Sequence, residues 1–108
     1  MENTVLEKFH QGRQSLGTFS AIGSPLAVES LRYTGLDYVI VDTEHSPAGI
    51  ESAAAQIAAA QGAGLTALAR ANEISRTAVL RLLDVGAQGV VVPCVETVEE
   101  VRELVRDA

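Results

Sequence analysis

One local pattern recurs four times along the 108 residues of this chain, and it constrains the fold more than any other feature. Each copy holds a short apolar run, a turn with a helix start signal and a stretch of helical spacing, and in the first three copies a glycine follows. The apolar runs are the predicted strands, at residues 16–20, 38–42, 65–70 and 89–93. Strand–helix units repeated in this order form a parallel sheet with right-handed crossovers. The sequence therefore predicts an α/β fold of four βα units.

Two of the predicted strands are continuously apolar rather than alternating. These segments are Tyr38-Val-Ile-Val41 and Val90-Val-Val92. Such runs are typical of strands that are covered on both faces, as in parallel sheets.

The segments between the strands carry the start signals of helices. Ser24 and Ser46 are each followed by proline, which gives an N-cap with proline at the first helical position. Thr97 and Glu100 have the spacing of a capping box. A Thr4-x-x-Glu7 box predicts a short leading helix at residues 4–10.

Glycines that follow the predicted helices, and apolar faces along two of these helices, support the helix predictions. Three glycines follow predicted helices, where a left-handed residue is favoured: Gly35, Gly62 and Gly86. The helix after the second strand has an apolar stripe at helical spacing, formed by Ile50, Ala53, Ala54, Ile57 and Ala58. The last helix places its own apolar residues on one face, at Val98, Val101, Leu104 and Val105.

Composition and charge exclude several classes of function. The net charge is -6 and no Lys/Arg run occurs, so we expect no nucleic-acid partner. No apolar stretch approaches the ~20 residues of a membrane helix, and residues 1–13 do not resemble a signal peptide. The single cysteine, Cys94, is expected to be a small packing residue and fits a reducing compartment. A cytoplasmic protein is therefore expected.

Polar residues follow the predicted strands. Parallel α/β folds carry their catalytic and binding residues at this carboxyl edge of the sheet. Asp42, Glu44 and His45 lie in one short loop after the second strand. A histidine beside carboxylates accepts a proton at neutral pH, which suits a general base. The alternative is that His45 only bonds the backbone at the start of the next helix.

Arg70 ends a strand of small apolar residues. A cation at this position can hold a carboxylate and stabilise a developing enolate. The alternative is a structural ion pair with Asp42 or Glu44. Asp84 lies in the last turn of its helix, where an anion is unfavourable, although a solvated surface carboxylate is the commoner interpretation there.

Taken together, these segments resemble the HpcH/HpaI aldolase family in order and spacing. The matching stretches are Leu16-Gly-Thr-Phe19, Gly23-Ser-Pro25, Asp42-Thr-Glu-His45, Arg70, Leu83-Asp-Val-Gly-Ala-Gln-Gly-Val-Val-Val-Pro93 and Glu96-Thr-Val-Glu-Glu100. The resemblance runs over essentially the whole chain. It implies that residues 1–108 are a single partial domain, the N-terminal half of a TIM (β/α)8 barrel, truncated after the fourth βα unit. A whole barrel takes about 250 residues.

The resemblance also implies a reaction, a lyase that cleaves a 4-hydroxy-2-oxo acid to pyruvate and an aldehyde. His45 resembles the catalytic base, Arg70 the stabiliser of the enolate, and Asp84 the acidic residue that raises the basicity of the histidine. Phe19 falls where the family often has an aromatic residue near the substrate. A divalent metal (Mg²⁺, Mn²⁺ or Co²⁺) is the implied cofactor.

Two departures from the family qualify this prediction. Thr43 stands where the family usually has glycine, and we expect it to tighten the loop that Asp42 and Glu44 support. The family's metal ligands come from strands beyond the fourth, so we expect no metal site in this chain and little activity of the isolated chain. We expect a homo-oligomer or completion by another chain, with any contact between His45 and Asp84 crossing a subunit interface.

Two other functions stay open at this stage. One is a non-catalytic half-barrel that serves as an assembly or binding module. The other is a related barrel lyase that acts on phosphoenolpyruvate or a citryl-type thioester.

Overall fold

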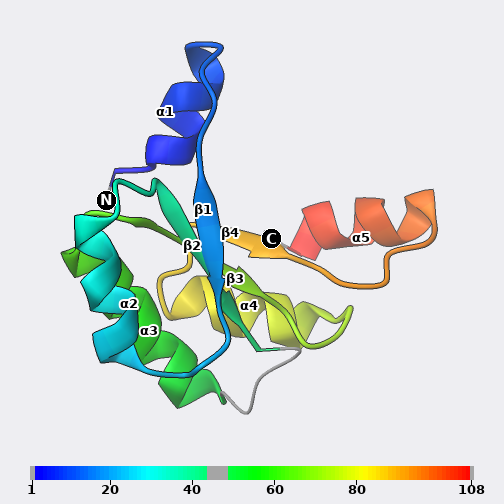
Figure 1. Ribbon diagram of the computed structural model, residues 1–108. Coiled ribbons are helices and arrows are strands. Elements are labelled where there is room, and N and C mark those ends of the chain that lie inside the picture. The colour runs from blue at the N-terminus through cyan, green and yellow to red at the C-terminus, as the bar shows by residue number, and fades with distance from the viewer. Residues whose placement is uncertain (1, 44–48, 108) are drawn as a thin grey trace.

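A computed structural model describes residues 2–43 and 49–107 of the chain. Strands and helices alternate in the order that the sequence predicts (Figure 1). The strands are β1 (Gly17–Ser20), β2 (Tyr38–Asp42), β3 (Thr66–Arg70) and β4 (Gly89–Val91). The helices are α1 (Thr4–His10), α2 (Pro25–Ser30), α3 (Ile50–Gly62), α4 (Arg76–Asp84) and α5 (Val98–Asp107), with a 3-10 turn η1 (Leu31–Tyr33) after α2.

The four strands are parallel and lie side by side in the order β1-β2-β3-β4. Phe19 is level with Ile40, which is level with Leu68, and Asp42 is level with Arg70 at the carboxyl edge. A sequential order of this kind is that of a (β/α)8 barrel, whereas doubly wound sheets change direction at a switch point. The predicted α/β class and the half-barrel arrangement are both confirmed.

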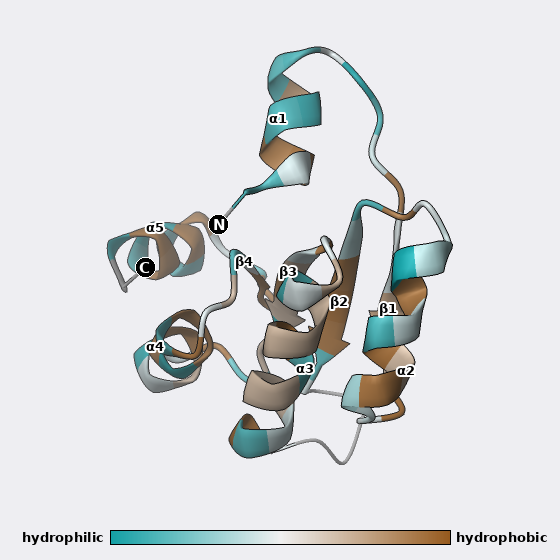
Figure 2. Cartoon of the chain, turned by 90° about the vertical axis from the view of Figure 1, so that its left-hand side faces the viewer, coloured by the Kyte–Doolittle hydropathy of each residue, from teal (hydrophilic) through white to brown (hydrophobic). Residues whose placement is uncertain are grey.

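One face of the sheet packs against α2, α3 and α4 (Figure 2). Small residues allow the close approach of α3 to the strands, because Ala53 and Ala60 face Ala67 and Ala69 in a single buried cluster. The other members of this core are Val28, Val39, Val41, Ile57, Leu65, Ala71, Leu82 and Ala87. The predicted stripe on α3 is confirmed in part, since Ala58 is exposed.

The opposite face of the sheet is only partly covered. Its side chains alternate along each strand with those of the helix-covered face. Ile40 and Leu68 are half-buried, and Phe19 is 50% exposed. In a closed barrel this face points to the interior. The continuous apolar runs are thus explained, because one set of side chains serves the helix layer and the other set serves the barrel interior.

The leading helix α1 lies at the amino edge of the sheet, where polar contacts hold it. The backbone N–H of Thr4 donates to the Thr66 hydroxyl at 2.9 Å, and Lys8 Nζ lies 2.7 Å from Asp37 Oδ1. The Lys8 hydrogen bond, together with the Leu16 backbone N–H, lowers the pKa of Asp37 below its ordinary value.

The predicted capping box of this helix is wrong. Asn3 is the N-cap, and its side chain accepts a hydrogen bond from the Leu6 N–H. Thr4 is the first helical residue, and its N–H is already bound to β3. The helix therefore begins at Thr4, and its N-cap is Asn3, which the Thr4-x-x-Glu7 spacing did not indicate.

Two of the three predicted left-handed glycines are confirmed. Gly35 and Gly86 have φ angles of 78° and 105°. Gly62 is instead the last residue of α3, and Gly64 takes the left-handed conformation with φ 83°. The Leu65 N–H bonds back to the Ala60 carbonyl at 2.9 Å, so the left-handed residue comes two positions later than predicted. The predicted start of this helix, Ser46-Pro47, lies outside the described residues.

The segment after β4 differs from its prediction. The strand ends at Val91 rather than Pro93, and Cys94 is exposed with a left-handed φ of 58°. The expectation that Cys94 is a packing residue is therefore wrong, because the chain has already left the sheet and turns there.

The last helix, α5, begins as predicted and packs along α4 (Figure 2). The capping box is confirmed, because the Glu100 N–H donates to the Thr97 hydroxyl at 3.2 Å and the Thr97 N–H donates to the Glu100 carboxylate at 3.1 Å. Its predicted apolar face is not covered, since three of the four valine and leucine positions are exposed: Val98, Val101 and Val105. None of the described helices combines the length and apolar character that a membrane span requires.

Candidate functional site

The carboxyl edge of the sheet carries an ion pair between neighbouring strands. Arg70 ends β3, and Asp42 ends β2 at the same level. The guanidinium donates through Nε to Asp42 Oδ1 at 3.2 Å and through Nη2 to Asp42 Oδ2 at 2.7 Å. This two-pronged geometry is the one in which arginine and a carboxylate match best. It fixes the plane of the guanidinium relative to the sheet.

The pair lies largely out of water. Asp42 is 2% exposed, whereas the Arg70 side chain retains 21% of its exposed area. A buried charge is tolerated where it is paired and hydrogen-bonded, because the desolvation cost is then offset. Arg70 is thus the more exposed member, and the uncovered sheet face is the side from which a ligand can approach it.

An aromatic ring completes the arrangement. The Cζ atom of Arg70 lies 4.7 Å from the centroid of the Phe19 ring, within the range of a cation–π contact. Phe19 is half exposed and belongs to β1, two strands away in the sheet order. We call Phe19, Asp42 and Arg70 the strand-end cluster.

Backbone bonds hold the strand ends together around this cluster. The Thr43 N–H donates to the Arg70 carbonyl at 3.2 Å, and the Thr43 hydroxyl donates to the same oxygen. The Ala71 N–H donates to the Val91 carbonyl at 2.8 Å. The hydroxyl of Thr43 therefore adds a fastening between β2 and β3 that glycine cannot supply.

A buried polar network supports the loop after β1. Gln56 on α3 is fully buried; its Oε1 accepts from the Ser20 hydroxyl at 2.7 Å and its Nε2 donates to Ser52 Oγ at 3.2 Å. Ser52 Oγ in turn donates to the Gly23 carbonyl at 3.4 Å. This network joins the end of β1, next to Phe19, to the helix layer.

Of the predicted site residues, the structure brings Phe19, Asp42 and Arg70 together. Glu44 and His45 lie outside the described residues, so their predicted roles stay predictions. Asp84 is exposed and is the last residue of α4. Because α4 runs away from the carboxyl edge over nine residues, about 13 Å, Asp84 lies at the far end of its helix from Arg70.

The geometry is compatible with both of the roles that the sequence analysis considered for Arg70. The ion pair with Asp42 is present, as the structural interpretation expected. A guanidinium oriented by such a pair is also prepared to bind the carboxylate or enolate oxygens of a ligand. The contact between Phe19 and Arg70 was not predicted. Strand alternation could have indicated it, because both residues lie on the uncovered face.

A metal site is not formed by the residues that the structure describes. No group of three His, Cys, Asp or Glu side chains among them is placed to hold an ion. The Asp42 carboxylate is directed at Arg70 through both oxygens. Since Mg²⁺-type ions require several oxygen ligands, the described residues do not fit the implied cofactor.

Fold and site together define a class of protein. A sequential parallel sheet with an oriented ion pair at its carboxyl edge has the arrangement of a segment of a (β/α)8 barrel, the fold that carries its active sites at that edge. Residues 15–107 match the model of the HpcH/HpaI aldolase/citrate lyase family, and the chain belongs to that family.

Curated relatives agree with this assignment. The chain is 34% identical over 104 residues to a hydroxypyruvate/pyruvate aldolase of Roseovarius nubinhibens, a match that covers 96% of this chain and 40% of that protein. It is 30% identical over 106 residues to a 4-hydroxy-2-oxo-heptane-1,7-dioate aldolase of Escherichia coli, with 98% and 40% covered. The chain thus spans about 40% of the length of these relatives.

Solved structures show the same relationship. Citrate synthase SbnG matches with a TM-score of 0.91 at 31% identity, over 96% of this chain and 42% of that one. The HpcH/HpaI aldolase of Desulfitobacterium hafniense matches with a TM-score of 0.87 at 34% identity, over 97% and 41%. The chain therefore belongs with aldolases and lyases in sequence and in structure.

Proposed function

We propose that this chain carries the 2-oxo-acid-binding part of a carbon–carbon lyase, with Arg70 as the cation that binds the oxo acid. The orientation of the Arg70 guanidinium by Asp42 at the carboxyl edge of the sheet is the observation that carries this proposal. The names of the aldolase relatives support the choice of substrate class.

The proposed reaction is the cleavage of a 4-hydroxy-2-oxo acid to pyruvate and an aldehyde. A base removes the proton of the C4 hydroxyl, the bond between C3 and C4 breaks, and the aldehyde leaves. The electron pair stays on the pyruvate fragment as an enolate, which is then protonated at C3. Arg70 stabilises the negative charge that develops on the enolate oxygen, since a fixed cation requires no reorganisation during the step.

The other proposed roles rest on the family resemblance. His45 is the base, Asp84 raises its basicity from a neighbouring subunit, and Glu44 supports the loop of His45. Phe19 forms a wall of the substrate site, a role that its half-exposed ring beside Arg70 supports. A divalent metal is part of the proposed enzyme, with ligands outside the described residues, so we expect no metal-dependent turnover by the chain alone.

A second candidate reaction is a condensation that forms citrate. It is favoured by the TM-score of 0.91 with a citrate synthase. Both reactions form or break a bond to an enolate, so the strand-end cluster suits either.

The experiment that tests the proposal completes the barrel with a relative. The chain is fused to the part of the Escherichia coli 4-hydroxy-2-oxo-heptane-1,7-dioate aldolase that it does not match. Release of pyruvate from a 4-hydroxy-2-oxo acid is measured with Mg²⁺, Mn²⁺ or Co²⁺, and citrate formation is measured in parallel. We expect Arg70→Ala to lower kcat by about 100-fold or more, the usual effect of removing one group that stabilises the developing charge.

Arg76→Ala is the matched control, because it removes an exposed cation at the start of α4. Its rate should stay within a factor of two of the parent fusion. An Arg70→Ala fusion that releases pyruvate as fast as the Arg76→Ala fusion contradicts the proposed role of Arg70.

A further inference from the structure

Three polar side chains among the described residues are buried: Asp42, Gln56 and Thr66. Asp42 belongs to the strand-end cluster, and the Thr66 hydroxyl accepts the Thr4 N–H at the amino edge of the sheet. Gln56 lies in the middle of α3, is 0% exposed and has neither of these roles. Burying an amide is costly unless its polar atoms find partners, so the partners of Gln56 indicate what it holds in place.

Those partners form a directed chain of hydrogen bonds between the end of β1 and α3. The Ser20 hydroxyl donates to Gln56 Oε1 at 2.7 Å, and Gln56 Nε2 donates to Ser52 Oγ at 3.2 Å. Ser52 Oγ then donates to the Gly23 carbonyl at 3.4 Å. Gln56 and Ser52 lie on the same face of α3, because they are one helical turn apart. The last residue of β1 and the loop that follows it are thus both tied to the helix layer.

Ser20 and Phe19 project from opposite faces of β1. Ser20 is level with Val41, which is buried in the core against the helices, whereas Phe19 is level with Ile40 on the other face. The bond from Ser20 to Gln56 therefore holds the strand end against α3 and fixes the direction in which the Phe19 ring leaves the sheet.

The Phe19 ring cannot move far without losing Arg70. Arg70 Cζ lies 4.7 Å from the ring centroid, and a cation–π contact requires a distance within roughly 6 Å. A displacement of β1 by little more than ~1 Å therefore removes the contact. Arg70 does not follow the ring, because two hydrogen bonds to Asp42 hold its guanidinium in place.

The helix that carries Gln56 also packs against the strands that carry Asp42 and Arg70. Ala53 and Ala60 of α3 lie in one buried cluster with side chains of β2 and β3. Packing at the density of a protein interior leaves little room for relative movement. The same helix thus supports all three strands of the strand-end cluster.

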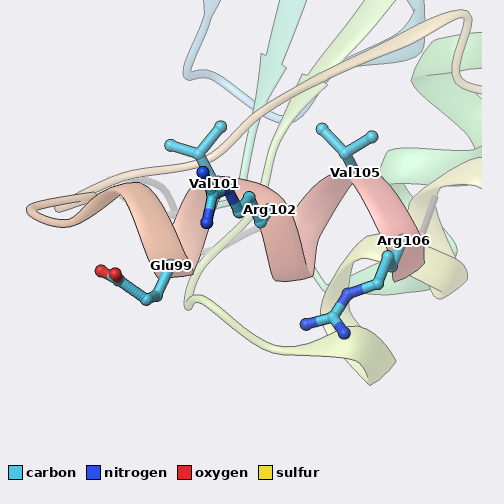
Figure 3. A pocket seen from close by; sticks show the side chains of 5 residues that line it. All are labelled: Glu99, Val101, Arg102, Val105 and Arg106. Carbon is cyan, nitrogen blue, oxygen red and sulfur yellow. The ribbon is translucent and has the colours of Figure 1, made fainter.

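Exposed side chains do not provide support of this kind, because they change rotamer within nanoseconds. The shallow hollow along α5 is an example. The residues that line it are all exposed, and Figure 3 shows Val101 and Val105 projecting from one face of the helix. A side chain that positions another must itself be packed and hydrogen-bonded, as Gln56 is.

We propose that Gln56 is a positioning residue of the oxo-acid site: through Ser20 it holds the end of β1 so that the Phe19 ring lies against the Arg70 guanidinium. This inference rests on the proposed function, in which Phe19 forms a wall of the substrate site. The ring contacts the substrate in the ground state and in the transition state alike, so its placement sets the affinity for the oxo acid rather than the rate of bond cleavage.

Nuclear magnetic resonance of the 108-residue chain tests the placement of the ring. The Phe19 ring shields the Arg70 side-chain protons that lie over it, and the difference between the parent and Phe19→Leu measures this shielding. Gln56→Met and Ser20→Ala each break the first bond of the chain, so each should lose about half of the shielding or more. Ser20 is only half-buried, so Ser20→Ala gives the reading if Gln56→Met does not fold.

Thr66→Val is the matched control. Thr66 is as buried as Gln56, but its hydroxyl bonds to Thr4 at the amino edge. This variant should keep the full shielding even if it unfolds at a lower denaturant concentration than the parent. The double variant Ser20→Ala/Gln56→Met should lose no more shielding than Gln56→Met alone, because both substitutions break the same bond.

Kinetics of the fusion with the Escherichia coli aldolase separate positioning from a loss of folded enzyme. Gln56→Met should raise KM for the 4-hydroxy-2-oxo acid by about threefold and leave kcat within about a factor of two. A substitution that only reduces the amount of folded enzyme lowers the apparent kcat at constant KM. Arg70→Ala differs from both, since its expected effect is on kcat.

Two kinds of result overturn the proposal. One is shielding that is absent from the parent, unchanged in Gln56→Met and Ser20→Ala, or reduced equally in Thr66→Val. The other is a fall in kcat at constant KM in the Gln56→Met fusion. A parent fusion that releases no pyruvate, or one that is insensitive to Arg70→Ala, contradicts the proposed function instead, because the shielding is measured without turnover.

Discussion

Asp42→Ala removes the carboxylate that accepts two hydrogen bonds from the Arg70 guanidinium, at 3.2 and 2.7 Å. Breaking a buried ion pair from one side costs about 3–5 kcal/mol, because the remaining charge stays desolvated. The Arg70 side chain is 21% exposed, so water recovers part of its solvation. We therefore expect the free energy of unfolding to fall by about 3 kcal/mol. In a chain of 108 residues this lowers Tm by about 12 °C.

Denaturant unfolding at one protein concentration measures this loss. The matched control is Glu29→Ala, which removes a half-exposed carboxylate 3.6 Å from Arg32 and should cost less than about 0.5 kcal/mol. The double variant Asp42→Ala/Arg70→Met removes both charges of the pair, so it should recover about 1 kcal/mol or more of the loss in Asp42→Ala. Equal losses in Asp42→Ala and Glu29→Ala would refute the reasoning.

Three further predictions concern stability. Gly17→Ala places a methyl group where the Tyr38 ring lies, so the free energy of unfolding in denaturant should fall by about 1–3 kcal/mol. The fall should be smaller when Tyr38→Ala is also present, and an equal fall in that background contradicts the contact. The lowered pKa of Asp37 means that its bond to Lys8 stabilises the fold above pH about 4, and that this stabilisation is lost as the pH falls further. The difference in unfolding free energy between the parent and Asp37→Asn should therefore shrink below that pH, and a constant difference contradicts this prediction. Cys94→Gly should raise Tm slightly, because glycine adopts the left-handed φ of 58° without strain, and a lower Tm contradicts this.

The strands could be predicted well because each combines an apolar run with a turn signal. The run at residues 38–42 is β2 as the structure has it, and the other three differ only at their ends. The parallel sheet followed from the repeat of strand and helix. The choice of a barrel required the order of the strands, which the resemblance supplied and the structure confirms.

The helix ends were harder to predict, because short-range signals compete there. Gly62 and Gly64 both follow the helical pattern of α3, and only the backbone path to Leu65 decides which of them turns left-handed. Asn3 and Thr4 are both good caps, and the bond from the Thr4 N–H to Thr66 decides between them. Contacts from distant parts of the chain therefore overrode the local pattern.

The candidate site was predicted as a set of residues rather than as a geometry. Asp42 and Arg70 were expected at strand ends, but their pairing depends on the register of β2 against β3. The Phe19 contact depends on the same register and on β1 as well. The sequence alone indicates which side chains lie at the carboxyl edge of the sheet. The pairing register of the strands decides which of these side chains contact one another.

Binding of a 2-oxo acid at Arg70 is the property on which the proposed function depends most directly. Titration of pyruvate into the isotope-labelled 108-residue chain should shift the amide resonances of Thr43, Arg70 and Ala71, which surround the strand-end cluster. These shifts should disappear in Arg70→Met and persist in Arg76→Met, because only the first substitution removes the oriented cation. Unshifted resonances at millimolar pyruvate, or equal shifts in the parent chain and Arg70→Met, would contradict the assignment of Arg70 as the oxo-acid-binding cation.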